Sequence, residues 1–294
     1  MLNFSSFNID DINWAAPIFQ NSGYCGADNT FASSYIWQRA YDLKVCYHDG
    51  FLFRRYGLKD YIYGFPLGNK DINLAIETLN KNNQGKGLKF IGLTRAMVAE
   101  IEKAKPEKFI FSENRDAEDY LYNALDLIEL QGKKYHSKRN HISKFKKLYN
   151  WTYEEISMKN IDDCKQLISQ WCIENNCKEN EFGINEEIYA LNIALDFFDK
   201  LNFIGGVIRV DNTPVALTLG EEINKEVFVV HFEKALSSYK GAYNIINNEF
   251  AKRKLKEYKY INREEDMGIE GLRKAKLSYY PSLLLEKYTA VLKD

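Results

Sequence analysis

Three strand-like segments follow one another between residues 203 and 233, and a long helix follows them after a short polar turn. The strands run from Phe203 to Val210, Val215 to Glu222 and Val227 to Glu233, with turn-forming residues between them. Strands joined by such turns form an antiparallel meander. The helix begins near Ala242 and carries an apolar side that packs inward. This order predicts an α/β fold in which mixed sheets are flanked by helices.

The rest of the second half completes the order. Two helices at 161–176 and 185–200 precede the strands, and a strand, a short helix and a final strand follow the long helix at 260–262, 268–277 and 283–291. A helix pair, a three-stranded meander, a strand-loop-helix unit and further strands are the order of the GNAT acyltransferase fold. We therefore expect a GNAT-like domain here. Substrate should enter where the sheet splays between strand 227–233 and strand 260–262.

A looser version of the same order occupies the first half. A helix, three short strands and a second helix are expected at 29–39, 43–47, 51–55, 61–63 and 71–82. The repetition predicts an internal duplication with GNAT-like domains at 1–150 and 151–294. The join falls after a highly charged stretch and before a strand that starts at Trp151.

Composition restricts the possible partners. The 294 residues are 45% hydrophobic, enough for two ordinary cores, and a formal charge of −1 means that attraction to RNA or anionic lipid must be local. Five scattered cysteines without Cys-x-x-Cys spacing predict reduced thiols, and no metal or nucleotide-loop motif is present. No signal peptide or long apolar run occurs. We expect a cytoplasmic protein without a transmembrane segment or metal, and peripheral membrane contact stays open.

A block of positive charge lies between Gln131 and Tyr153, where no acidic residue occurs. Its seven cations and two histidines are Lys133, Lys134, Lys138, Arg139, Lys144, Lys146, Lys147, His136 and His141. Cations without intervening carboxylates repel one another, so the block favours phosphate binding over a stabilising role. The alternative is a solvated helix face. The predicted contacts to RNA phosphates are Lys134, Lys138, Arg139 and His141.

Gly241 lies between a strand and a helix, where backbone N–H groups and the helix dipole favour an anion. GNAT acetyltransferases bind the pyrophosphate of coenzyme A at this turn, with a Gln or Arg three residues before the glycine and a small residue two after it. Ser238 and Tyr243 stand at those positions here. The ring of Tyr243 should obstruct a pyrophosphate, so coenzyme A is the less favoured cofactor.

Strand 227–233 carries a candidate general base. Alternation places four side chains on one face, namely Val227, Val229, His231 and Glu233. His231 titrates near neutral pH in its ordinary state and can accept a proton from a substrate. The alternative is a hydrogen-bonded structural histidine.

The short helix after Gly268 presents two cations. Three apolar residues are expected to form its buried stripe, namely Ile269, Leu272 and Ala275. That leaves Arg273 and Lys276 side by side, where they can grip a phosphate or carboxylate. The alternative is pairing with Glu264, Glu265 or Asp266, which precede the helix.

Three segments carry a family resemblance. Segment 260–276 reads YINREEDMGIEGLRKAK, segment 132–141 reads GKKYHSKRNH and segment 28–31 reads DNTF. A strand, a polar loop and Gly-Leu-Arg-x-x-Lys in this order resemble the C-terminal domain family of phosphatidylglycerol lysyltransferases, most closely its soluble bacterial members. The resemblance implies tandem GNAT domains related to Fem-type enzymes, which move an amino acid from aminoacyl-tRNA to a lipid or peptidoglycan amine.

The first hypothesis is therefore an aminoacyl-transferase that uses aminoacyl-tRNA as donor and a small-molecule or peptide amine or hydroxyl as acceptor. In it Asp266 or His231 handles the proton, and RNA phosphates lie on the basic block and the Gly241 turn. The predicted substrate contacts are Arg273, Lys276, Arg263 and Glu233. The alternatives are an acyl-coenzyme A dependent N-acyltransferase, and a binding module that keeps the fold without turnover.

Overall fold

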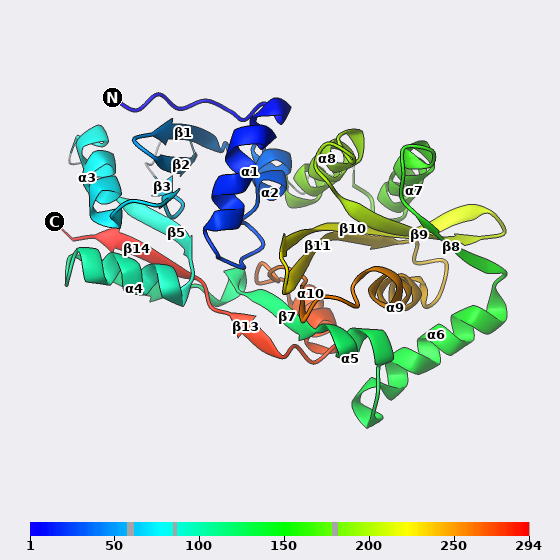
Figure 1. Cartoon of the computed structure of the whole chain (residues 1–294). Coiled ribbons are helices and arrows are strands. Elements are labelled where there is room, and N and C mark those ends of the chain that lie inside the picture. Colours follow the sequence, from blue (N-terminus) through cyan, green and yellow to red (C-terminus); the bar gives the residue numbers. More distant parts are fainter. Residues whose placement is uncertain (58–61, 85–86, 178–181, 294) are drawn as a thin grey trace. The chain divides into compact units, whose positions relative to one another are not determined.

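The computed structural model describes residues 1–57, 62–84, 87–177 and 182–293 (Figure 1). The chain forms two compact units, each with a seven-stranded mixed sheet. The first unit contains Met1–Tyr120, Glu265–Lys274 and Leu284–Asp294, and the second contains Leu121–Glu264 and Ala275–Leu283. The α/β class and the mixed sheets flanked by helices are confirmed.

The sheet of the first unit has the order β1-β2-β3-β5-β14-β6, with β4 paired to β2. Asp49 and Gly50 both have positive φ, as the two-residue hairpin between β1 and β2 requires. β3 and β5 run parallel, whereas β14 runs antiparallel to both of its neighbours. The strands are β1 (Lys44–His48), β2 (Phe51–Tyr56), β3 (Ile62–Tyr63), β4 (Leu67–Gly68), β5 (Lys89–Leu93), β6 (Phe109–Glu113) and β14 (Tyr288–Leu292).

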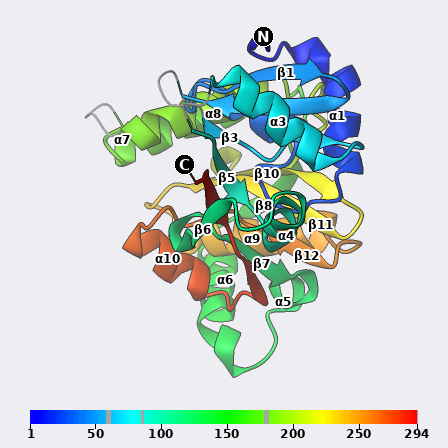
Figure 2. The ribbon, with the colours of Figure 1, turned by 90° about the vertical axis from the view of Figure 1, so that its left-hand side faces the viewer.

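Four helices pack on this sheet, with α1 and α2 paired on one side and α3 and α4 on the other (Figures 1 and 2). Each of the last three begins at a side chain that accepts a backbone N–H: Thr30, Asp71 and Thr94. The helices are α1 (Ile12–Asn21), α2 (Phe31–Trp37), α3 (Ile72–Asn82) and α4 (Arg95–Ala104), with short 3₁₀ turns at Ile9–Asp11 and Arg115–Ala117. The expected strands and helices of this half are confirmed, except that residue 61 lies outside the described residues.

The sheet of the second unit has the order β13-β7-β12-β11-β10-β9-β8. The expected meander is its centre, since β10 pairs antiparallel with both β9 and β11. The strands are β7 (Asp119–Asn123), β8 (Trp151–Glu155), β9 (Ile204–Val210), β10 (Thr213–Asn224), β11 (Val227–Ala235), β12 (Tyr260–Asn262) and β13 (Leu283–Leu285).

Helices cover both faces of this sheet, with α7 and α8 on one face and α9 on the other (Figure 1). α9 is buried along most of its length because it also packs against α5 and α6. The helices are α5 (Ala124–Glu129), α6 (His136–Leu148), α7 (Ile161–Glu174), α8 (Phe182–Asp196) and α9 (Ala242–Lys254), and a 3₁₀ turn spans Lys133–Tyr135. α10 (Glu270–Leu277) contains a junction between the two units.

The chain passes between the units several times. β7 comes from the first half of the sequence and lies in the second unit's sheet, whereas β14 comes from the end and lies between β5 and β6. Residue 150, where the sequence analysis placed the join between domains 1–150 and 151–294, lies between α6 and β8 in the second unit.

Candidate functional site

A parallel strand pair interrupts the antiparallel order of the second unit. β11 and β12 are paired from Val227 opposite Tyr260 to Val229 opposite Asn262. β12 ends at Asn262, whereas β11 continues to Ala235 along β10. The strands therefore diverge, and the side chains beyond this point are released from the ladder. The strand divergence lies where the sequence analysis placed substrate entry.

A β-bulge marks the divergence on β11. The register with β10 passes from Leu219–Phe232 to Gly220–Val230, which leaves His231 without an opposite residue. Glycine at position 220 fits this bulge because a Cβ there would overlap the carbonyl oxygen of Val229.

The bulge changes the face on which Glu233 lies. Phe228 contacts Phe250 of α9, and Glu233 accepts a hydrogen bond from Asn247 of the same helix. Glu233 therefore shares the α9 face with Phe228. The expected alternation, which placed Glu233 on the opposite face, is wrong because the extra residue at His231 shifts the parity of the strand by one.

His231 lies between two carboxylates in the protein interior. Its Nδ1 is 2.7 Å from Glu264 Oε1 and its Nε2 is 3.0 Å from Glu221 Oε1, and its side chain has no exposed surface. Burial lowers the pKa of His231, but the hydrogen bonds to Glu221 and Glu264 outweigh burial and raise the pKa to about 9. The ring is therefore protonated at neutral pH and donates both N–H groups. This geometry suits an electrostatic role better than the expected general-base role.

Arg263 follows β12 directly and reaches the α9 face of the divergence. Its Nη2 donates to Glu233 Oε1 at 2.9 Å, and the other oxygen of Glu233 accepts from Asn247 Nδ2 at 3.1 Å. The Arg263 side chain is 14% exposed and that of Glu233 is 11% exposed. The structure thus brings together these two predicted substrate contacts. The Oδ1 atom of Asn247 is buried and has no partner among the described residues.

Tyr279 connects this ion pair to α6. The Arg263 guanidinium lies 5.1 Å from the centroid of its ring, and Lys138 Nζ lies 3.8 Å from the same centroid. Lys138 also donates to Ser278 Oγ at 2.7 Å, and the Tyr279 hydroxyl accepts from Asn244 Nδ2 at 2.8 Å. Burial, followed by the positive charge of Arg263, lowers the pKa of Lys138 to about 8. Lys138, a predicted contact to RNA phosphate, therefore faces the divergence.

Several residues at this site have no role predicted from the sequence. These are Glu221, Asn244, Asn247, Ser278 and Tyr279. A signal was available for the two asparagines, because their spacing of three puts both on one face of a helix that follows the Gly241 turn.

α10 has the opposite orientation to the expected one. Ile269 and Leu272 are 53% and 36% exposed, whereas Lys276 is 9% exposed and donates to the carbonyl oxygen of Arg263. Arg273 also points inward, to Asp266. The predicted apolar stripe is wrong because charge pairing, rather than apolar burial, fixes the rotation of this short helix.

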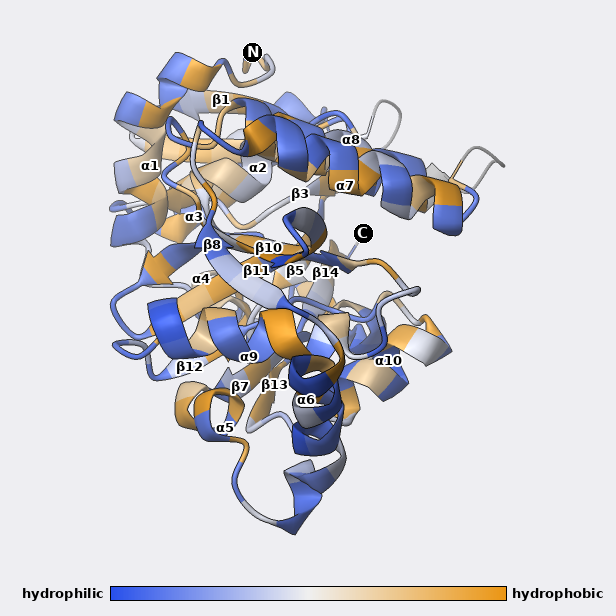
Figure 3. Cartoon of the chain, turned by 90° about the vertical axis from the view of Figure 1, so that its right-hand side faces the viewer, coloured by the Kyte–Doolittle hydropathy of each residue, from blue (hydrophilic) through white to orange (hydrophobic). Residues whose placement is uncertain are grey.

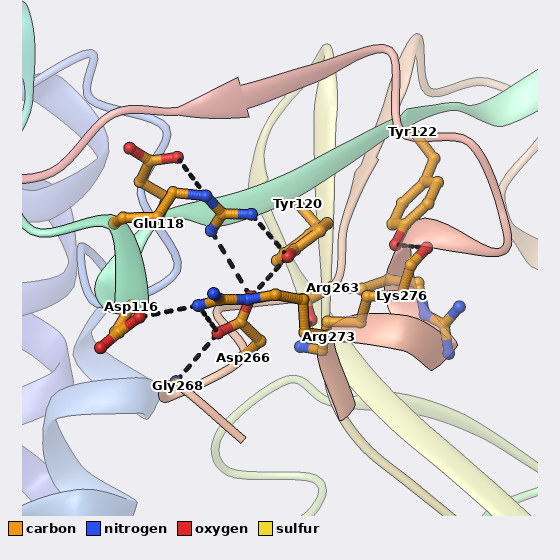
Figure 4. Close-up of polar contacts among 10 residues, drawn as sticks. Asp116, Glu118, Tyr120, Tyr122, Arg263, Asp266, Gly268, Arg273 and Lys276 are labelled. Carbon is orange, nitrogen blue, oxygen red and sulfur yellow. Dashed lines mark hydrogen bonds and ion pairs between the residues drawn. The ribbon is translucent and has the colours of Figure 1, made fainter. Parts of the chain in front are cut away.

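Asp266 is the centre of a separate cluster in the first unit (Figure 4). Its carboxylate has no exposed surface and accepts from Arg273 Nε at 2.8 Å, Tyr120 Oη at 2.5 Å and Gly268 N at 2.9 Å. Arg115 lies 3.4 Å away. The hydrogen bond from Arg273 has the largest effect and, with those from Tyr120 and Gly268, lowers the pKa of Asp266 far below its usual range against the effect of burial. An anion with this many donors suits an anchoring role better than the proton transfer expected of Asp266.

Tertiary contacts neutralise part of the basic block. α6 is largely hydrophilic (Figure 3), but its Lys146 pairs with Glu249 at 2.7 Å, and Lys134, in the 3₁₀ turn before the helix, pairs with Asp126 at 3.4 Å. Arg139 donates to the carbonyl oxygens of Leu130 and Gly132. Among the described residues, the cations that make no ion pair with a carboxylate include Lys133, Lys144 and Lys147, which are exposed, as is His141. These side chains are available for phosphate contacts.

The Gly241 turn is packed against α6 and against the carboxylate of Glu174. Gly241 has a φ of +95°, and a Cβ there would lie 2.9 Å from the carbonyl oxygen of His141 in α6. The Glu174 carboxylate accepts from the Ser237 backbone N–H at 2.7 Å and from Ser238 Oγ at 2.9 Å. A carboxylate of the chain itself thus lies where a pyrophosphate would bind.

The DNTF segment, residues 28–31, makes structural contacts within the first unit. Asp28 accepts from buried Lys287 at 2.6 Å, and Arg54 donates to the backbone carbonyl of Asp28 at 2.7 Å. Thr30 caps α2, and Phe31 is buried. The segment therefore fixes the loop between α1 and α2.

The fold and the strand divergence define a tandem GNAT-like α/β protein. The family model for the C-terminal region of phosphatidylglycerol lysyltransferase matches residues 20–291, and the chain belongs to that family. No helix among the described residues is long and apolar enough to cross a membrane.

Solved structures agree with this assignment. A protein of unknown function from Bacteroides thetaiotaomicron is 40% identical with a TM-score of 0.93, and the match covers 100% of both chains. L-PGS from Bacillus licheniformis is 15% identical with a TM-score of 0.65, over 95% of this chain and 90% of that one. FemX is 6% identical with a TM-score of 0.62, and the match covers 99% of this chain and 98% of that one. At these identities, the likeness to L-PGS and FemX shows a shared fold and no more.

A curated relative is an uncharacterized protein of Mycoplasmoides gallisepticum, 22% identical over 194 residues. The match covers 64% of this chain, and the chain spans only 61% of that relative's length.

Proposed function

We propose that this protein is an aminoacyl-transferase that works at the divergence of β11 and β12 and takes its amino acid from aminoacyl-tRNA. The observation that carries the proposal is the arrangement of charged side chains beside the divergence: His231 with Glu221 and Glu264 on one face, and Arg263 with Glu233 on the other. Membership of the lysyltransferase family supports the reaction type.

The reaction needs little covalent help from the protein. The lone pair of an acceptor amine attacks the carbonyl carbon of the aminoacyl ester, the bond from that carbon to the ribose oxygen breaks, and the ribose oxygen takes the proton that the amine loses. The ester is already activated, so orientation and charge stabilisation supply the acceleration. Arg263 has guanidinium N–H groups beyond the one that it donates to Glu233, and it can stabilise the oxyanion that develops on the carbonyl oxygen. His231 is buried and donates both N–H groups, so its charge holds Glu221 and Glu264 on the opposite face.

The alternative donor, acyl-coenzyme A, has less support. Glu174 and the backbone of α6 occupy the surroundings of the Gly241 turn, and an anionic pyrophosphate would have to displace a carboxylate that accepts two hydrogen bonds from Ser237 and one from Ser238. Aminoacyl-tRNA carries no pyrophosphate and does not need this turn.

The experiment uses the full chain and pools of tRNA charged with radiolabelled amino acids. Phosphatidylglycerol vesicles and amine-bearing peptides serve as acceptors in separate arms. We expect label to enter one acceptor fraction, and Arg263→Gln to slow the transfer while Arg95→Gln, which removes an exposed pair with Glu286, leaves it unchanged. The proposal would be overturned if the protein left the lifetime of the aminoacyl ester unchanged with every tRNA pool and instead turned over labelled acetyl-coenzyme A.

A further inference from the structure

Two cations approach the ring of Tyr279. Lys138 Nζ lies 3.8 Å from the ring centroid and the Arg263 guanidinium lies 5.1 Å from it. Arg263 belongs to the loop after β12 and Lys138 to α6, so the fold rather than local sequence brings them together. Two like charges near one ring repel each other unless an anion lies close to both.

The described carboxylates near these cations are insufficient to balance them. Glu233 pairs with Arg263 at 2.9 Å, and Lys138 has a hydroxyl, Ser278 Oγ, as its hydrogen-bond partner. Glu233 is also the carboxylate that raises the pKa of Lys138, against the larger effects of burial and of Arg263. The group therefore carries about one uncompensated positive charge in a half-buried setting.

The surroundings suit a bound group with polar edges. Asn244 and Asn247 reach this face from α9, and the buried Oδ1 of Asn247 lacks a partner among the described residues. An unpaired buried oxygen costs free energy that a donor on a ligand would recover. The face thus offers two cations and an amide acceptor together.

We propose that Lys138 and Arg263 hold a singly charged anion beside Tyr279, and that in the proposed reaction this anion is the phosphodiester that precedes the 3′-terminal adenosine of the donor. The identification of the anion rests on the proposed function. An aminoacyl ester has no free carboxylate, so the phosphodiester is the negative group nearest to its reactive carbon. Lys138 then contacts the donor close to the reaction, whereas the exposed lysines of the same helix contact RNA farther from it.

The test measures binding of three probes to the full chain by calorimetry. Cytidylyl-adenosine carries one phosphodiester, adenosine carries none, and glycine offers a carboxylate instead. We expect cytidylyl-adenosine to bind more tightly than adenosine. Tighter binding of glycine than of the dinucleotide would assign the anion site to a carboxylate and overturn the choice of phosphodiester.

Two variants on α6 distinguish binding at the proposed anion site from nonspecific electrostatic attraction of the probe to the helix. Lys138→Met keeps the apolar stem over Tyr279 and leaves no carboxylate unpaired, and Lys144→Met removes an exposed cation from α6. We expect Lys138→Met to weaken cytidylyl-adenosine binding roughly tenfold, as removal of a charge-assisted hydrogen bond does, and Lys144→Met to have little effect. Equal weakening in the two variants would refute the site.

The pH dependence supplies a second readout. The charged or titratable groups that face Lys138 are Arg263, Glu233 and Tyr279, and Lys134 lies four residues earlier, in the 3₁₀ turn before α6. Because the amine loses its proton above about pH 8, wild-type affinity should fall there, and the fall should be absent in Lys138→Met. Transfer from aminoacyl-tRNA without Lys138-dependent binding refutes this inference alone, whereas Lys138-dependent binding without transfer refutes the proposed function alone.

Discussion

The buried imidazolium of His231 gives the second unit a pH dependence that the structure specifies. The pKa rises from 6.5 to about 9 in the folded protein, although burial opposes the rise, because Glu221 and Glu264 accept hydrogen bonds from the ring. A difference of about 2.5 units corresponds to about 3 kcal/mol of folding free energy. Because the folded pKa is the higher one, this stabilisation is fully present below pH 6.5 and is lost as the pH rises through 9.

The perturbation is Glu264→Gln. It removes the carboxylate at 2.7 Å from His231, leaves that of Glu221 at 3.0 Å, and should move the pKa of His231 towards 6.5. An NMR titration of the ring protons reports that pKa, and urea unfolding at pH 6.5 and 9 reports the free energy. Between pH 6.5 and 9, the free energy of unfolding of wild type should fall by about 3 kcal/mol more than that of a protein with an unshifted histidine. For Glu264→Gln the fall should be smaller than for wild type. A wild-type ring that titrates at or below 6.5, or equal losses in both proteins, would refute the reasoning.

Three further predictions test other parts of the chain. Gly220→Ala should lower the free energy of unfolding by about 2 kcal/mol or more, because its Cβ meets the Val229 carbonyl, whereas Gly271→Ala in α10 meets nothing within 4 Å and should be neutral or stabilising in thermal melts. RNA affinity should fall with salt, and Lys144→Gln with Lys147→Gln should reduce the log-log slope by roughly 1 for each phosphate-binding cation removed, with an unchanged slope as the contrary outcome. Calorimetry should show no micromolar binding of acetyl-coenzyme A, since Glu174 occupies the turn, and a micromolar dissociation constant would restore the acetyltransferase hypothesis.

Local sequence signals were sufficient for most elements of the fold. Hairpin turns, apolar periodicity and cap residues such as Thr94 act within a few residues, so the meander and the helices around it were predictable. Local signals do not predict that β7 and β14 pair with strands far from them in sequence. The pairing of a strand with a distant partner depends on tertiary packing, and a short strand such as β7 carries little information about its neighbour.

Local sequence signals predict fewer of the residues at the site than of the elements of the fold. Arg263 and Glu233 are predictable as site residues because each lies in a segment with a sequence signal of its own. Tyr279 was missed because its role arises from Lys138 and Arg263, which come from elements far apart in the chain. The face of Glu233 was mispredicted because a bulge of one residue is not visible in an otherwise regular alternation.

Asp266 provides the test of whether a buried carboxylate in the first unit contributes to chemistry or to stability. Arg273 pairs with two carboxylates at 2.7 Å each, Asp266 with no exposed surface and Asp116 with 60% exposure, so the two form a matched pair around one guanidinium. Asp266→Asn should lower the free energy of unfolding by about 3 to 5 kcal/mol, because it breaks a buried ion pair and places an amide against the donors of Arg273 and Tyr120. Asp116→Asn should change it by about 0 to 1 kcal/mol, as expected for an exposed pair. Below the melting temperature of Asp266→Asn, aminoacyl transfer per folded molecule should equal that of wild type. A variant that melts normally but fails to transfer would return Asp266 to the role of proton acceptor.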